Sequence, residues 1–198
     1  MQFFLFFAFL FFLSSHTLAN EIPDIFSPYL PGECRLGEES ASLTLENGIK
    51  VLLISDSTAN QNKVALNVLA GYRDDPVDIP GMAHFLEHML FLGTEDNPSP
   101  SIYGDFITKS GGYQNAYTNY DTTTYHLSVD PSHIDRALSL FGQQFSVPLL
   151  SQEYVSKEKK VIHAEFQYRK DSVFRKTLSV AKNAFFGKGQ NISKFSTG

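Results

Sequence analysis

This chain of 198 residues is 42% hydrophobic, which is enough to bury one core but leaves little for a second domain. Its formal net charge of −5 is ordinary for a soluble domain, and it has no run of Lys and Arg, which argues against a nucleic-acid partner. Cys34 is the only cysteine, so a disulfide within the chain is excluded, and a bridge between chains has no support in the sequence.

The chain begins with an apolar run of eleven residues, 3–13, followed by small and polar residues up to Ala19. This pattern predicts a secretory signal over residues 1–19, because a membrane-spanning helix needs about 20 apolar residues. We expect export, to the periplasm in a Gram-negative bacterium and otherwise by secretion, with no membrane contact after cleavage. The lack of Lys or Arg before the run leaves an uncleaved anchor or a buried N-terminal segment as the alternative. The triplet Asn191-Ile192-Ser193 fits the N-glycosylation pattern, but such triplets are common.

Residues 20–40 contain three prolines and are predicted to form an irregular arm that leads into one domain over residues 41–198. The domain opens with two apolar stretches separated by Asn47-Gly48, a pair that predicts a tight hairpin. Alternating apolar residues over 64–70 predict the next strand.

Residues 80–93 carry the most informative pattern of the chain. Apolar residues surround His84, Glu87 and His88, which predicts a helix buried on nearly every side with these three as its only polar groups. A Pro-Gly pair before the helix and Gly93 after it suit its start and a left-handed cap. At about 100° per residue, the three polar side chains lie on one side, where one metal ion can reach both imidazoles. The order H-x-x-E-H is the inverzincin signature of zinc peptidases.

Further elements are predicted downstream of this helix. Periodicity indicates a strand over residues 123–129 and helices over residues 102–110, 131–145 and 152–170. The order of the elements favours an α+β fold, an antiparallel β-sheet flanked by α-helices, over a doubly wound α/β fold. Three other histidines fit sheet-surface or solvated positions better than ligand positions: His126, His133 and His163.

A catalytic zinc ion takes three protein ligands, so the third must come from another element. The helix predicted over 152–170 places Val155, Glu158, Ile162 and Glu165 on one stripe. Buried carboxylates need partners, which makes Glu165 the best candidate for the third ligand. From spacing alone, a solvated face that carries Glu158 and Glu165 fits equally well, because charged residues flank both.

Four segments occur in a characteristic order. They are GMAHFLEHMLFLGT at 81–94, GGYQNAYT at 111–118, two glutamates separated by six residues at 158 and 165, and SKFSTG at 193–198. Together they resemble the insulin-degrading enzyme and pitrilysin family of inverzincin zinc peptidases, over roughly residues 42–198. The resemblance implies part of the N-terminal domain of a pitrilysin-like peptidase, because the family's chains are several times longer.

The resemblance also implies roles for single residues. His84, His88 and Glu165 are expected to bind one zinc ion per chain, with Glu158 supporting the ligands. In the matching family segment, an Asn-Ala pair on a sheet edge contacts the substrate backbone. The residues of this chain at those positions are Asn115 and Ala116.

We therefore expect a zinc-dependent endopeptidase that hydrolyses extended peptides, with zinc activating a water molecule and Glu87 acting as general base. The expected partners are peptide substrates and a second half-enzyme chain, because the family's catalytic chamber closes when a second half contributes further groups. The alternative is a catalytically weak or inactive family member that serves as a binding or assembly module or as one half of a split protease.

Overall fold

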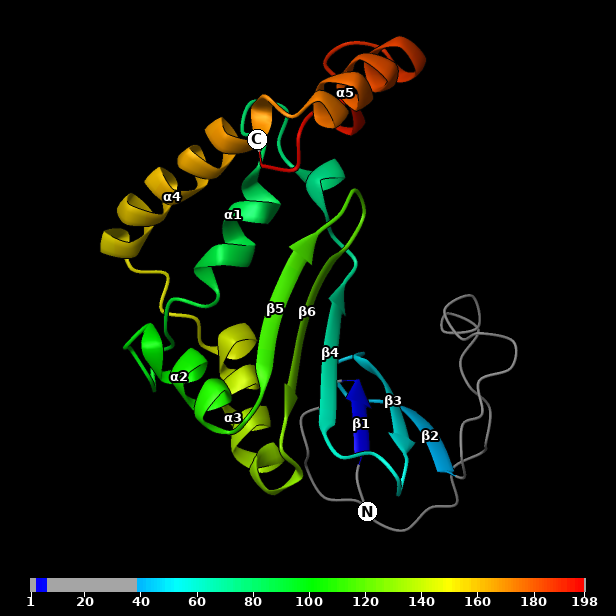
Figure 1. The fold of residues 1–198 in the computed structure, drawn as a ribbon, viewed down its shortest axis with the longest axis vertical. Coiled ribbons are helices and arrows are strands. Elements are labelled where there is room, and N and C mark those ends of the chain that lie inside the picture. The colour runs from blue at the N-terminus through cyan, green and yellow to red at the C-terminus, as the bar shows by residue number, and fades with distance from the viewer. Residues whose placement is uncertain (1–2, 7–38, 198) are drawn as a thin grey trace. The chain divides into compact units, whose positions relative to one another are not determined.

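The computed structural model describes residues 3–6 and 39–197 (Figure 1). The predicted secretory signal and irregular arm lie outside the described residues, apart from the four residues of strand β1 (Phe3–Phe6) and the last two residues of the arm, 39 and 40. Within the described ranges, no helix is both long enough and apolar enough to cross a membrane.

The hairpin predicted around Asn47-Gly48 is confirmed. Strands β2 (Glu39–Thr44) and β3 (Lys50–Ser55) pair antiparallel, with Thr44 opposite Lys50 next to the turn. Gly48 has a φ of 86°, in the left-handed region that glycine adopts without steric cost. The Asn47 side chain accepts a hydrogen bond from the backbone of Ile49 at 3.1 Å, which fixes the turn locally.

Six strands form one sheet in the order β2-β3-β1-β4-β6-β5. The other three strands are β4 (Asn62–Val68), β5 (Tyr113–Thr118) and β6 (Thr123–Val129). Strand β1 pairs antiparallel with β3 and parallel with β4, so this one pairing departs from the antiparallel sheet that the sequence predicts. Alternate residues of β6 are buried, as predicted.

Five α-helices accompany the sheet in the described part of the chain: α1 (Met82–Met89), α2 (Ser101–Lys109), α3 (Ile134–Ser146), α4 (Gln152–Lys170) and α5 (Val173–Phe186). Three short 3₁₀ turns complete the described elements: η2 (Tyr72–Asp74), η3 (Pro131–His133) and η4 (Asn191–Ser193). Helix α4 has the predicted bounds, and Ser151 caps its start by accepting a hydrogen bond from the Tyr154 amide. The chain therefore has the α+β fold that the sequence predicts.

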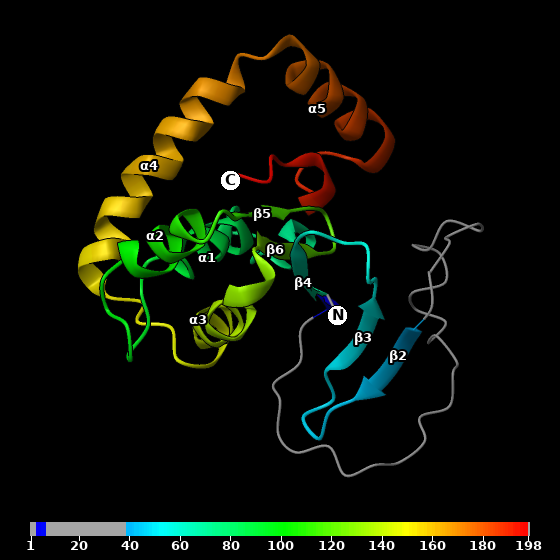
Figure 2. The same cartoon turned by 60° about the horizontal axis from the view of Figure 1, so that its bottom comes forward.

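The described residues form two compact units. The first comprises residues 3–6, 39–66, 106–114 and 126–142, and the second comprises residues 67–105, 115–125 and 143–197. In the first unit, Ala137 and Phe141 of α3 are fully buried. In the second, the ring of Tyr125 approaches those of Phe91 and Phe145. Helix α1 packs against α4 in the same unit (Figures 1 and 2). Both helices that carry the predicted metal ligands thus belong to one unit.

Gly112 allows the start of β5 to approach β6 closely. A Cβ atom added at Gly112 would lie 2.1 Å from the backbone oxygen of Ser128. We expect Gly112→Ala to lower the free energy of unfolding by about 3 kcal/mol, because backbone must move to relieve the overlap. The matched control is Gly104→Ala within α2, where nothing lies within 4 Å of the added atom. It is expected to stabilise by up to about 1 kcal/mol. Urea unfolding of both variants measures the difference, and equal stabilities would contradict the account.

Candidate metal centre

Helices α1 and α4 bring two imidazoles and a carboxylate together. His84 and His88 lie one turn apart on α1, with ring centroids 4.6 Å apart. Oxygens of Glu165 on α4 lie 3.8 Å from His84 Nε2 and 3.6 Å from His88 Nε2. The three candidate ligand atoms all lie within 4.8 Å of one another. Two imidazole nitrogens and one carboxylate oxygen form a donor set typical of catalytic zinc, so the residues present fit that ion.

The stripe predicted on α4 faces α1. Ile162 is buried, Val155 is half-buried, and the side chains of Glu158 and Glu165 are only 13% and 19% exposed. A solvated face, which spacing alone allows, is therefore excluded for this pair. Both carboxylates instead meet the histidines of α1.

Glu158 fixes the orientation of His88. The Nδ1 atom of His88 lies 2.8 Å from Oε1 of Glu158. Because an ionised carboxylate only accepts hydrogen bonds, we assign the proton to Nδ1, which leaves the lone pair of Nε2 directed toward Glu165. A carboxylate behind a histidine in this way orients the ring and raises its basicity toward a metal.

His84 is held in the neutral form. Burial, and next the repulsion that a protonated His84 would meet from a protonated His88, lower the pKa of His84 to about 4, although Glu165 acts in the opposite direction. A neutral imidazole keeps the lone pair that a metal ligand needs. Its other nitrogen, Nδ1, is buried and has no hydrogen-bond partner within the described residues, so no contact of the kind that Glu158 makes with His88 orients this ring.

Arg169 contacts the same carboxylate from one helical turn away. Its Nη1 atom lies 2.7 Å from Oε1 of Glu165, and this arginine side chain is 44% exposed. The contact compensates the partly buried negative charge of Glu165 and restricts its rotation. Arg169 was not among the predicted site residues, although the i,i+4 spacing of Glu and Arg on one helix is a signal that could have found it.

Glu87 lies on the same helix but makes a different contact. It is buried, and Thr118 on β5 donates a hydrogen bond to its Oε2 atom at 2.5 Å. Burial raises the pKa of Glu87 above its usual value, while the hydrogen bond from Thr118 acts in the opposite direction. Thr118 was missed by the sequence analysis, because no local pattern reveals a contact between a strand and a helix 31 residues apart.

The start of α1 is capped from a distance. Its N-cap residue is Gly81, which has no side chain to cap the helix. Instead, the carboxylate of Asp75 accepts hydrogen bonds from the amides of Gly81 (2.7 Å) and Ala83 (2.8 Å). Asp75 is only 7% exposed, so this contact is protected from water. The sequence analysis missed Asp75, since a cap six residues upstream does not follow the usual spacing.

One expectation about α1 is wrong. The sequence predicts a helix buried on nearly every side, but Met82 and Leu86 are 42% and 45% exposed. These two residues are one turn apart and share a face that the described residues leave uncovered. His84, Glu87 and Met89 are the buried residues of this helix. Two of its three polar side chains are therefore buried, while part of its apolar surface is exposed.

The predicted substrate-binding residues lie at the edge of the sheet. Strand β5 is the last strand in the sheet order, and residues along it alternate between exposed and half-buried. Asn115 is exposed and Ala116 is half-buried. Thr118, which contacts Glu87, lies on the same face of the strand as Ala116.

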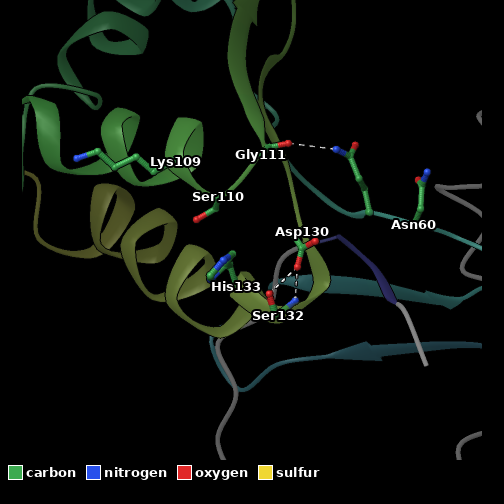
Figure 3. Close-up of a pocket in the computed structure, with 8 residues that line it drawn as sticks. Asn60, Lys109, Ser110, Gly111, Asp130, Ser132 and His133 are labelled. Atoms are coloured by element: carbon green, nitrogen blue, oxygen red, sulfur yellow. Dashed lines mark hydrogen bonds between the residues drawn. The ribbon is translucent and has the colours of Figure 1, made fainter.

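The remaining histidines predicted to be non-ligands do not belong to the group of candidate ligands. His163 is exposed on α4, and His126 is half-buried on β6, where its ring approaches Tyr113. His133 lines a separate polar pocket of about 450 Å³ (Figure 3). There Asp130 accepts two hydrogen bonds from Ser132, so this carboxylate is already partnered. None of the residues that line this pocket is a candidate metal ligand.

Comparison with known proteins points to one family. Residues 50–191 match the profile of the family described as insulinase, peptidase family M16. The chain is 40% identical to an insulin-degrading enzyme of Drosophila melanogaster over 163 residues, which cover 78% of this chain and 16% of that protein. It is also 40% identical to the insulin-degrading enzyme of Homo sapiens over 129 residues, which cover 65% and 13%.

A solved structure agrees with the sequence comparisons. The crystal structure of pitrilysin superposes with a TM-score of 0.74 and 27% identity, covering 82% of this chain and 17% of that one. The chain thus spans less than a fifth of the length of each of these relatives.

The contact between Glu158 and His88 gives a prediction about metal affinity. We expect Glu158→Ala to weaken zinc binding by about 10- to 100-fold, because the His88 ring loses the partner that orients it. Glu153→Ala is the matched control on the same helix, since Glu153 is 69% exposed and contacts only Lys157 among the described residues. Competition with a chelator of known zinc affinity measures both. Identical affinities for Glu158→Ala and the parent would refute the orienting role.

Proposed function

The chain belongs to the insulinase family of peptidases, M16, a family of zinc metallopeptidases, and on this premise we propose that it carries the zinc site of an endopeptidase that cuts extended peptides. The observation that carries the proposal is the convergence of His84, His88 and Glu165 from two helices far apart in the sequence. We propose one zinc ion per chain, held by these three residues.

The residues around the ligands have distinct tasks in this proposal. When bound, zinc supplies a Lewis acid that polarises a peptide carbonyl and makes hydroxide available near neutral pH. Glu158 holds the His88 ring through Nδ1, so that Nε2 would be free to bind the ion. Arg169 limits the rotation of Glu165.

Glu87 is proposed as the general base. Its carboxylate takes a proton from the attacking water and delivers it to the amide nitrogen that leaves, so that it ends each cycle unprotonated. Burial raises the pKa of Glu87, and a base is most effective when its pKa lies nearer the working pH. Thr118 holds one carboxylate oxygen, which leaves the other available for proton transfer.

We propose that β5 binds the substrate. An extended peptide can add to the outer edge of a terminal strand through main-chain hydrogen bonds, and this mode favours extended shape over particular side chains. Asn115 and Ala116 lie on β5 three and two residues before Thr118. A peptide on this edge would therefore run toward the strand end that contacts Glu87.

A second chain half and export complete the proposal. Because this chain covers only 13% to 18% of the length of its curated relatives, groups that stabilise charge during the reaction would come from elsewhere. The exposed Phe174 and Phe185 of α5, at 75% and 84%, and the exposed Leu86 of α1 offer apolar surface for such a half. The same surfaces favour the alternative, a weakly active binding module or one half of a split protease.

Export by an N-terminal signal remains part of the proposal.

Metal analysis separates the two readings. The purified parent chain is expected to contain about one zinc per chain, and Glu165→Gln is expected to lose most of it because a carbonyl oxygen is a weaker zinc ligand than a carboxylate. His163→Ala, which removes an exposed histidine from the same helix, should keep the parental content. Plasma mass spectrometry gives the stoichiometry. A folded parent without zinc would support the binding module instead.

Replacement of the proposed base tests the reaction. Glu87→Gln keeps the volume of the side chain and should retain zinc while cleavage of a quenched fluorescent peptide slows by about 10² to 10⁴-fold. Glu95→Gln, an exposed glutamate just after α1, is the matched control and should cleave at the parental rate. A Glu87→Gln protein that binds zinc and cleaves normally would remove Glu87 from the mechanism. A parent that binds zinc but cleaves nothing would favour the alternative.

A further inference from the structure

Asn191, the first residue of η4, connects the C-terminal segment to the loop before α1. Its Nδ2 atom donates hydrogen bonds to the backbone oxygens of Arg73 at 2.7 Å and Asp75 at 2.8 Å. Because both acceptors are carbonyl oxygens, the amide can satisfy them only with its nitrogen turned toward the loop. The orientation of this side chain is therefore determined by its contacts.

Asp75 extends this connection to the metal centre. Its backbone oxygen receives the hydrogen bond from Asn191, and its buried carboxylate accepts the amides of Gly81 and Ala83 at the start of α1. His84 follows Ala83 directly in the chain. A displacement of Asp75 therefore shifts the helical turn that carries the first candidate ligand.

The segment from η2 to the start of α1 is held from two sides. On one side, the amides of Tyr72 and Arg73 in η2 donate to the backbone oxygens of Asn119 (3.0 Å) and Tyr120 (2.8 Å) in the turn between β5 and β6. On the other side, Lys194 donates to the backbone oxygen of Val77 at 2.9 Å, beside the contacts of Asn191.

The turn that carries Asn191 is itself anchored. The hydroxyl of Ser193 donates to the backbone oxygen of Gly187 at 3.0 Å, and Ser193 is only 6% exposed. Because this turn is fixed, its contacts can hold Arg73 and Asp75 in a defined position.

We propose that Asn191 is a positioning residue that holds Asp75, and through Asp75 the first turn of α1, where metal binding requires it. The inference rests on the proposed function for the identity of the metal. The triplet Asn191-Ile192-Ser193 then has a structural role. The Nδ2 atom, to which an N-glycan would be attached, is the atom that donates both hydrogen bonds. Loss of the amide donor should affect zinc affinity although Asn191 touches no ligand.

The sharpest variant is Asn191→Asp, which keeps the shape of the side chain and turns the donor into a charged acceptor facing two carbonyl oxygens. We expect zinc affinity to fall about tenfold, at the low end of the range for groups that support metal ligands. Asn191→Ala should weaken zinc binding in the same direction. The control is Gln190→Ala, which replaces an exposed neighbour whose side chain takes no part in these contacts, and it should leave the affinity unchanged.

Hydrogen exchange provides a readout that does not depend on zinc. In metal-free Asn191→Asp, peptides that contain Gly81 and Ala83 should exchange faster than in the parent, while peptides from residues 134–142 of α3, which belong to the other unit, should be unchanged. Parental exchange at the start of α1, or parental zinc affinity, would overturn the inference. Acceleration spread over the whole chain would overturn it too, since that marks a general loss of stability. If the parent binds no zinc, the proposed function fails and the exchange pattern alone decides the role of Asn191.

Discussion

Packing of α4 against α1 encloses four ionisable side chains in one contact, and the properties of the site follow from how their charges are compensated. They are His84, His88, Glu158 and Glu165. A buried charge without a partner is costly, so each must be paired or neutralised. Glu158 meets His88, Glu165 meets Arg169, and His84 is neutral because its pKa is lowered. The two Nε2 lone pairs and one carboxylate oxygen that remain face one another, an arrangement that a divalent cation would complete.

Much of this arrangement can be predicted from local sequence, and the reason differs between residues. The bounds of α4 follow from its periodicity and from Ser151 at its start, and the hairpin follows from Asn47-Gly48, because each signal lies within a few residues of its effect. The contacts of Asp75, Thr118 and Asn191 could not be predicted, because the partners of these residues lie elsewhere in the chain and no local pattern indicates them. The exposure of Leu86 could not be predicted for a related reason, since periodicity indicates an apolar surface but not which residues cover it.

The helix that carries both histidines could not persist on its own. With eight residues, α1 is shorter than the roughly 12 to 15 that an isolated helix needs to be even marginally stable in water. Its N-cap glycine offers no side chain, so the orphan amides of its first turn depend on Asp75. Packing against α4 and the distant cap therefore determine where the imidazoles point. The geometry of the metal centre is a tertiary property, although its residues lie in a short sequence motif.

Strand β5 links the proposed base to the proposed substrate edge, because its side chains alternate between two faces. Successive side chains point to opposite faces, so Ala116 and Thr118 share the half-buried face while Asn115 is exposed. Thr118 uses this face to reach Glu87, which leaves the main chain of Asn115 and Ala116 for hydrogen bonds along the outer edge. A slip of one residue in the register of β5 would turn Thr118 away from Glu87 and shift the edge groups at the same time. The contact between Thr118 and Glu87 would therefore couple the position of a peptide bound as proposed to the position of the proposed base.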